Sequence, residues 1–237
     1  MGKIVDFATA ERRGLASGAS AVPIVDWFDG VEMMASVLVI GPAVRHEATV
    51  AVGSDQYLYM LRGEARIECG DSSAALAADD WVLIEEGRTF AVSGDAEILS
   101  VVAPPPGSGK KRPGFQGRMR RMRTRELPVV DLPAEKKRRT YLANAEIAGS
   151  ERGHAMIVAY TGETLTKRHH HPNAESLFVV LTGRVRFLVN GAERVLGRGE
   201  AAFFPINDSH ALRSGDGNAL SFLEFHIPGA FETRYDA

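Results

Sequence analysis

Residues 167–183, KRHHHPNAESLFVVLTG, hold three consecutive histidines and a carboxylate in a chain of 237 residues that has only seven histidines. On a β-strand, His169 and His171 project from the same face, because side chains two positions apart share a face. Two imidazoles on one face supply half of a metal site. Imidazole suits Zn, Cu, Fe and Ni, and a carboxylate extends the range to Mn. The alternative for such a run is a solvated polar turn.

A third histidine, His210, lies in the segment 199–212, GEAAFFPINDSHAL, where a strand ends in a turn and the chain then continues. In a small closed barrel, the inward-facing residues of neighbouring strands meet in one interior. His210 can therefore join His169 and His171. Taken alone, a histidine of this kind is more often a hydrogen-bonded core residue, but the joint spacing favours a metal site.

The elements that would position these histidines are short runs rich in Val, Ile, Leu and Phe, bounded by Gly and Pro, as in β-sandwiches and barrels. The segment 57–70, YLYMLRGEARIECG, is similar to 177–191, LFVVLTGRVRFLVNG, at a displacement of 120 that matches Gly63 to Gly183. The same displacement aligns 79–92 with 199–212. One displacement that serves two segments indicates a tandem duplication, with units at 1–104 and 127–237.

Residues 105–126 form a basic, Pro- and Gly-rich linker between the two predicted units. From Lys110 to Arg139 there are 12 Lys or Arg residues and three acids. Such a run can contact nucleic acid. Its single aromatic residue, Phe115, and the lack of a recognisable nucleic-acid-binding fold favour a segment that pairs with acidic surface instead.

These motifs resemble those of the cupin superfamily, whose first motif has His-x-His, a Glu and then a Gly. Its second motif has Gly, Pro, a second Gly two residues later, and His. The resemblance covers both halves and implies an all-β fold of two tandem cupin-type jelly-roll β-barrels joined by the basic linker. The positions of this sequence that match the motifs are His169, His171, Gly183, Gly199, Pro205 and His210.

Two positions depart from the family pattern. Asn207 replaces the second Gly of the second motif, and Asn is the residue other than Gly that best tolerates a positive φ. The family's Glu position, seven residues before Gly183, is Ser176, and Glu175 is one residue out of register. A one-residue slip turns a side chain to the opposite face, so either a β-bulge restores Glu175 to the interior or the metal has three histidines alone. We include Glu175 as the fourth ligand.

The N-terminal half has no histidine at the corresponding positions. At the displacement of 120, the positions that correspond to the four candidate ligands are occupied by Thr49, Ala51, Asp55 and Phe90. Because a phenyl ring cannot coordinate a metal, we expect a degenerate first barrel without a metal site. The expected cofactor is one divalent transition metal per chain, with Fe favoured and Mn, Zn, Ni and Cu as alternatives.

A metal held by three or four protein ligands keeps open positions and acts as a Lewis acid, an orienting template or an O₂ activator. Chelation then suits a small oxygenated molecule, a carboxylate or a diketone-like compound. Lys167, Glu224 and His226 are the candidate catalytic residues. Glu224 and His226 share one face of the strand FLEFH, where one of them can serve as a general acid or base.

Members of the resembled family include dioxygenases, decarboxylases, isomerases, lyases and non-enzymatic binders. We favour a non-haem iron dioxygenase; the alternatives are a redox-neutral isomerase, lyase or decarboxylase using Mn, Zn or Ni, and a non-catalytic small-ligand-binding cupin. The expected partner is a small-molecule substrate, with a homodimer as the candidate assembly and with no nucleic acid or membrane. No apolar stretch of ~20 residues, no signal-like N-terminus and the single Cys69 together favour the cytoplasm.

Overall fold

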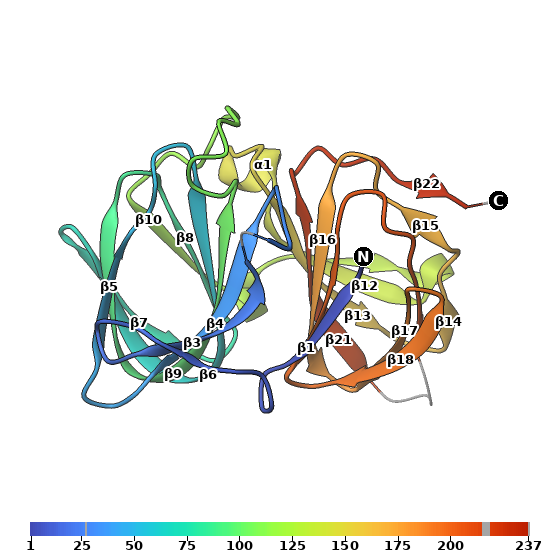
Figure 1. The fold of residues 1–237 in the computed structure, drawn as a ribbon, viewed down its shortest axis with the longest axis horizontal. Coiled ribbons are helices and arrows are strands. Elements are labelled where there is room, and N and C mark those ends of the chain that lie inside the picture. The colour runs from blue at the N-terminus through green and yellow to red at the C-terminus, as the bar shows by residue number, and fades with distance from the viewer. Residues whose placement is uncertain (27, 215–218, 237) are drawn as a thin grey trace. The chain divides into compact units, whose positions relative to one another are not determined.

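The computed structural model describes residues 1–26, 28–214 and 219–236, and β-strands dominate it (Figure 1). The chain divides into two compact units. The C-terminal unit comprises Met1–Thr9, Pro128–Ile147 and Gly153–Ala237, and the N-terminal unit comprises Ala10–Leu127 and Ala148–Arg152. In the described part of the chain, no helix has the length and apolar character needed to cross a membrane.

These boundaries differ from the predicted ranges 1–104, 105–126 and 127–237. β1 (Lys3–Asp6) pairs antiparallel with β19 (Glu200–Phe204), so the first nine residues belong to the C-terminal unit. β10 (Met119–Arg123) pairs antiparallel with β8 (Asp80–Ile84), so the segment predicted as a linker extends the sheet of the N-terminal unit. The high charge of the basic segment concealed this edge strand, because edge strands carry charged residues that discourage further pairing.

The N-terminal unit is one nine-stranded antiparallel sheet with the order β10-β8-β6-β9-β4-β3-β2, in which β5 also pairs with β9 and β7 with β6. The remaining strands of this unit are β2 (Arg13–Gly14), β3 (Ser20–Val25), β4 (Met34–Ile40), β5 (Arg45–Thr49), β6 (Asp55–Cys69), β7 (Ser72–Ala77) and β9 (Thr89–Ala103).

The C-terminal unit contains a seven-stranded sheet, β1-β19-β16-β21-β13-β12-β11, a four-stranded sheet, β14-β20-β17-β18, and the pair β15-β22. Its strands, besides β1 and β19, are β11 (Val129–Leu132), β12 (Lys137–Ala143), β13 (His154–Tyr160), β14 (Thr164–Leu165), β15 (His169–His170), β16 (Glu175–Thr182), β17 (Arg184–Val189), β18 (Ala192–Gly197), β20 (Ala211–Ser214), β21 (Leu220–Ile227) and β22 (Arg234–Tyr235). Helical structure is limited to α1 (Ala145–Ala148) and the 3₁₀ turns η1 (Thr124–Glu126) and η2 (Pro133–Glu135) in the described residues.

Each unit has its own buried core. In the N-terminal unit, aliphatic side chains such as Ile67 and Ile98 surround Phe90. In the C-terminal unit, the core cluster is richer in aromatic rings and includes Phe178 and Phe222. Burying each such side chain stabilises the fold by roughly 1.5–3 kcal/mol.

The matched glycines Gly63 and Gly183 play the same part in both units. Both have positive φ values, 80° and 76°. A Cβ would lie 2.0 Å from the Asp95 carbonyl oxygen in one case and 2.3 Å from that of Ala219 in the other. Only glycine fits such a close backbone approach at positive φ. The long strands β6 and β16 therefore change register at the same place, as a duplicated unit requires.

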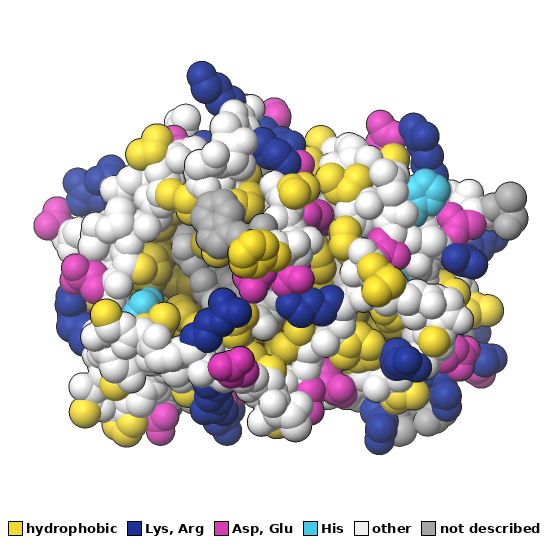
Figure 2. All heavy atoms as spheres, in the orientation of Figure 1, with side chains coloured by type: hydrophobic (Ala, Val, Ile, Leu, Met, Phe, Trp, Pro, Cys, Tyr) yellow, Lys and Arg dark blue, Asp and Glu magenta, His cyan; other side chains and the backbone are white. Residues whose placement is uncertain are grey.

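The basic segment is neutralised locally rather than forming a uniform basic surface. Arg118 pairs with Asp71 at 2.9 Å, and Arg121 pairs with the buried Asp80 at 2.6 Å. On the face drawn in Figure 2, Lys and Arg side chains stand among Asp and Glu side chains. The expectation that this segment pairs with acidic surface agrees with these contacts.

Candidate metal centre

Two strand ends of the C-terminal unit bring the three predicted histidines together. His169 and His210 form an antiparallel bridge in which each backbone N–H donates to the other's carbonyl, at 3.0 and 2.8 Å. His171 accepts a hydrogen bond from the Asn207 N–H at 2.9 Å through its carbonyl, so the two motifs are tied together twice. Asn207 has a φ of 65°, and its predicted tolerance of positive φ is confirmed.

The three imidazoles converge. Their ring centroids are 4.5 Å apart for His169 and His210, 5.3 Å for His169 and His171, and 5.5 Å for His171 and His210. One nitrogen of each ring lies within 4.8 Å of the corresponding nitrogens of the other two. Small side-chain rotations therefore suffice to give all three rings bonds of about 2.0–2.1 Å to one cation.

In each of the three histidines, a hydrogen bond at Nδ1 leaves Nε2 as the atom that is free for a metal. Nδ1 of His169 lies 2.8 Å from the Lys167 carbonyl oxygen, Nδ1 of His171 lies 2.7 Å from that of Glu232, and Nδ1 of His210 lies 3.0 Å from that of Asp208. A carbonyl accepts only, so each Nδ1 carries the proton and each Nε2 offers a lone pair. This backbone support of the non-ligating nitrogen is typical of metal-binding histidines.

Nε2 of His171 and Nε2 of His210 are buried and have no hydrogen-bond partner among the described residues. Burial lowers the pKa of His171 to about 4 and that of His210 to about 3. Both rings are therefore neutral near pH 7. Two buried nitrogen lone pairs that receive no hydrogen bond are costly unless a group from outside the chain binds them. A divalent transition metal fits this pair of imidazole nitrogens together with that of His169.

Glu175 is not part of the group whose ligand atoms converge. Phe178 and Val180 of β16 belong to the interior core cluster, and alternation along the strand places Ser176 on the same face and Glu175 on the opposite one. The register shift of this strand lies between Val180 and Thr182, beyond Glu175. The bulge that would restore Glu175 to the interior is therefore absent from this stretch, and the structure brings together three histidines without this carboxylate.

Ser176, at the family's carboxylate position, instead contacts a fourth histidine. Its Oγ lies 3.1 Å from Nδ1 of His226, whose Nε2 lies 2.8 Å from Oε1 of Glu224. His226 stacks on Phe231 and its centroid is 4.6 Å from that of His171. The predicted shared face of Glu224 and His226 thus becomes a hydrogen-bonded pair directly beside the three histidines.

The ionisation of this pair is set by its surroundings. Burial raises the pKa of Glu224, but the hydrogen bond and charge of His226, with the positive charges of Arg139 and Lys137, outweigh burial and lower it. Glu224 is therefore a carboxylate that accepts from His226 near neutral pH. Such a pair can hold a proton between Nε2 and Oε1 and exchange it with a bound molecule.

A cavity of about 870 Å³ opens over the three histidines and is within the usual size range for small-molecule sites. The predicted residues that line it are His169, His171, His210, Lys167, Glu224 and His226. Tyr160 and Phe178 line it as well. Arg184, Arg186 and Arg213 of the same unit are exposed and do not line it.

Sequence reasoning missed several residues of this cavity. His154 pairs with His226 in the β13–β21 register and lines the cavity. Arg139 of β12 also lines it, and its buried Nε has no partner among the described residues. Phe231 and the Glu232 carbonyl come from the C-terminal tail that folds back over His171, and no sequence signal marked them.

The corresponding positions of the N-terminal unit carry no comparable cluster in the residues that the structure describes. Phe90 lies in the aliphatic core, and Thr49 donates to or accepts from Thr89, with their hydroxyl oxygens 2.8 Å apart. Asp55 accepts hydrogen bonds from Ser150, Arg152 and the backbone of Phe115. The described residues contain one group of metal-binding geometry, the one formed by His169, His171 and His210.

Comparison with known proteins agrees with this fold. Residues 156–226, which contain all three histidines, match the family model of the cupin domain. The comparison with curated proteins finds no match.

Similar solved structures include two oxalate decarboxylases. That of Lactobacillus farciminis, described as a formate complex, is 14% identical over 98% of this chain and 88% of that chain, with a TM-score of 0.72. That of Bacillus subtilis is 14% identical over 98% and 78%, with a TM-score of 0.71. Protein YlbA of E. coli is 11% identical over 95% and 90%, with a TM-score of 0.75. At these identities the likeness shows the fold, and the prediction of an all-β fold of tandem cupin barrels is confirmed.

Proposed function

We propose that this protein of the cupin superfamily binds one divalent transition metal at His169, His171 and His210 and acts as a redox-neutral lyase, of decarboxylase type, on a small carboxylate. The observation that supports this proposal most strongly is the convergence of one ring nitrogen from each of three histidines, each with its Nδ1 bonded to a carbonyl oxygen. The hydrogen-bonded Glu224–His226 pair lines the same cavity. A metal bound there would supply a Lewis acid and a template for substrate oxygens.

The choice of reaction class differs from the one that the sequence favoured. The iron dioxygenase has less support than the redox-neutral alternative, because oxalate decarboxylases are among the structural neighbours. Decarboxylation breaks a C–C bond, leaves its electron pair on the remaining carbon and then requires a proton. The Glu224–His226 pair, 2.8 Å between Oε1 and Nε2, can deliver that proton within the cavity.

Cationic groups of the cavity suit an anionic substrate. Arg139 places an unpartnered, buried Nε in the wall, and Lys167 lies with its Nζ 5.9 Å from the Tyr235 ring centroid. A guanidinium binds a carboxylate through paired N–H donors. Arg139 would therefore hold and orient the substrate, while Glu224 and His226 would handle the proton.

Two observations favour different identities for the metal. Oxalate decarboxylase of B. subtilis is described as having Mn(II) centres, whereas three imidazoles without a carboxylate suit Fe, Ni, Zn or Cu better. The proposal commits to one divalent first-row metal per chain, and elemental analysis of the purified protein identifies it.

The deciding experiment incubates the metal-loaded chain with oxalate and other small mono- and dicarboxylates and measures CO₂ release and O₂ consumption together. We expect CO₂ release without stoichiometric O₂ uptake. In Glu224→Gln, which preserves shape but not charge, we expect the metal to remain and the rate to fall by about 10²–10⁴-fold. Stoichiometric O₂ consumption would return the function to the dioxygenase class.

A further inference from the structure

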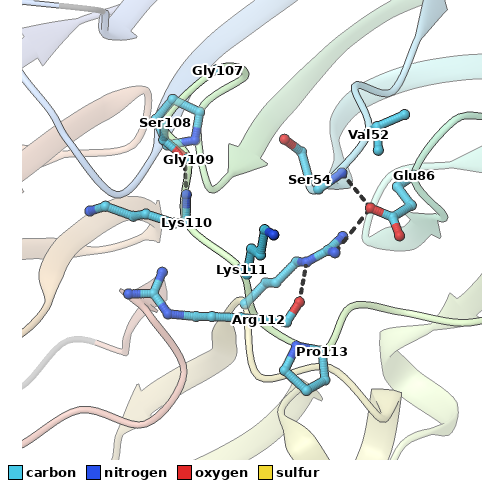
Figure 3. Close-up of a pocket in the computed structure, with 13 residues that line it drawn as sticks. Val52, Ser54, Glu86, Gly107, Ser108, Gly109, Lys110, Lys111, Arg112 and Pro113 are labelled. Atoms are coloured by element: carbon cyan, nitrogen blue, oxygen red, sulfur yellow. Dashed lines mark hydrogen bonds and ion pairs between the residues drawn. The ribbon is translucent and has the colours of Figure 1, made fainter.

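A second cavity, of about 660 Å³, lies in the N-terminal unit and shares no lining residue with the cavity of the metal centre. One wall is the loop of residues 105–113, PPGSGKKRP, and the other is formed by residues 52–54 with Glu86 and Arg152. Figure 3 shows the loop arching around a space that faces Glu86. The proposed function leaves this cavity unused.

The three consecutive cations of the loop are not equivalent. Lys110 and Arg112 both pair with the buried Glu32, with 2.9 Å between Arg112 Nη1 and Oε2. In Figure 3 these two side chains extend to the same side, whereas Lys111 stands between the loop and Glu86. Lys111 makes no hydrogen bond or ion pair with any other residue that the structure describes. Its ammonium group is available to a ligand.

Arg152 provides a buried donor on the opposite wall, with a side chain only 5% exposed. Its Nε donates to the Arg112 carbonyl at 3.0 Å, Nη1 to Asp55 at 3.0 Å and Nη2 to Glu86 at 3.0 Å. A guanidinium has five N–H donors, so two remain beyond these three bonds with described residues. Buried donors favour an acceptor, since leaving one unsatisfied costs about 1–3 kcal/mol.

The charge around the cavity is unbalanced in favour of an anion. Four cations stand against three carboxylates, which leaves one positive charge in excess; the groups are Lys110, Lys111, Arg112 and Arg152, with Glu32, Asp55 and Glu86. Because the carboxylates each pair with one or more of the other three cations, the excess resides on Lys111.

Apolar surface accompanies these donors. Val52 lines the cavity and is 85% exposed, and Pro105 and Pro113 line it from the loop. A bare inorganic anion would leave this surface in water. A ligand with an apolar portion would cover it and gain roughly 25 cal/mol for each Å² removed from water.

We propose that this cavity is a second small-molecule site, which binds a small organic carboxylate that carries an apolar portion. The carboxylate binds Lys111 and the remaining N–H groups of Arg152, and the apolar portion packs on Val52 and the two prolines. The site is independent of the metal centre, so its occupancy does not require the metal or the substrate of that centre.

The test is calorimetric titration of the metal-loaded full-length chain with hexanoate at low ionic strength, alongside hexanamide, which matches its shape without the charge. We expect saturable binding of hexanoate at the second site and at least tenfold weaker binding of hexanamide. Lys111→Ala raises the Kd about tenfold, as for the loss of one charged hydrogen bond, and Lys111→Glu abolishes the binding. Lys111 is exposed, so neither variant disturbs the core.

Two control variants separate this site from other anion binding. Arg62→Ala removes an exposed cation of the same unit, paired with Glu97, and leaves the Kd within about twofold. Arg139→Ala weakens anion binding at the metal-site cavity and leaves hexanoate binding at the second site intact. Equal affinity for hexanamide, unchanged binding in Lys111→Glu, loss of binding in Arg139→Ala, or no binding by the unmodified chain would each overturn the proposal.

Discussion

The two barrels repeat one pattern of strands and glycine turns, yet their interiors are opposite in character. Where the C-terminal unit places His210, which stacks on Phe204 at a centroid distance of 4.2 Å, the N-terminal unit places Phe90 in an aliphatic core. Gly63 and Gly183 keep the same backbone role in both. The frame common to the two units therefore depends on their turns and core strands, and the N-terminal unit keeps that frame without the three histidines of the candidate metal centre.

The difference also concerns how each interior satisfies its polar groups. The N-terminal unit pairs buried polar side chains with one another, as in Arg152 with Asp55 and Gln56 with Ser100. The C-terminal unit buries His171, His210 and His226 and provides each Nδ1 with an oxygen partner. Buried polar groups are tolerated when they are hydrogen-bonded. In the C-terminal interior, this support at Nδ1 leaves the buried Nε2 atoms of His171 and His210 without a partner among the described residues, which is the arrangement that the proposed metal requires.

The largest expected effect is on metal content. In His171→Ala, removal of one of three ligands lowers the metal from one per chain to close to zero after dialysis, because three donors are the minimum for firm binding of this kind of ion. Elemental analysis of the purified variant measures it.

His46→Ala is the matched control, because His46 is a histidine of the N-terminal unit whose Nδ1 lies 3.0 Å from the Ser17 hydroxyl. Its metal content should equal that of the unmodified chain. Two metals per chain in the unmodified protein, or a loss in His46→Ala, would contradict the assignment of the site to one barrel.

The next effect is on stability and concerns Asp55, the first residue of β6, which corresponds to Glu175 at the start of β16. Asp55 is fully buried and pairs with Arg152 at 3.0 Å. Asp55→Asn removes its charge and leaves a buried guanidinium with Glu86 as its remaining carboxylate, which should lower the free energy of unfolding by about 3–5 kcal/mol. Urea unfolding measures this, and a change below about 1 kcal/mol would show that Glu86 compensates.

Much of the fold was accessible from the sequence, because turns and periodicity are local. The glycine pair at a fixed displacement identified the duplication, and the His-x-His spacing placed two imidazoles on one face. The edge strand β10 was not accessible, since Pro, Gly and a high density of charge precede and fill it. Pairing partners distant in the chain, such as β1 with β19, leave no local signal.

The candidate site divides in the same way. His169, His171 and His210 follow from residue type and spacing, and Glu224 and His226 follow from strand parity. The acceptor for Nδ1 of His171 is the backbone carbonyl of Glu232. Because every residue type has such a carbonyl, this contact leaves no signal in the sequence. His154 and Arg139 reach the cavity from strands whose inward face could be assigned only after the register of β12, β13 and β21 was known.

A smaller effect concerns the pH dependence of the metal-free chain through His154, a cavity histidine outside the ligand set. Burial lowers its pKa to about 4, with the nearby His226 and Arg139 adding to the shift and Glu224 opposing it. The unfolded chain binds this proton near pH 6.5, so the neutral ring favours the folded state above that pH and the benefit is lost as the pH falls toward 4.

We expect His154 to account for roughly 1–2 kcal/mol of the stability lost between pH 7.5 and pH 5. The comparison is His154→Gln, which cannot titrate, in the same urea experiment at both pH values. An equal loss in the variant would assign the acid sensitivity to other groups, and the single described histidine of the N-terminal unit, His46, would be the next to replace.

The smallest expected effect is on the affinity for the metal and concerns Glu175, which corresponds to Asp55 of the N-terminal unit. Glu175→Gln should leave the affinity for the metal within about twofold, because the strand turns its side chain away from the face of Ser176 and Phe178 and its carboxylate is not among the converging ligand atoms. Competition with a chelator measures the affinity. Ser176→Ala serves beside it as the control from the interior face, since it removes the hydrogen bond to His226 without removing a ligand. A tenfold loss of affinity in Glu175→Gln would mean that the strand changes register when the metal binds, and the two barrels would then differ in the alignment of β6 and β16 as well as in their interiors.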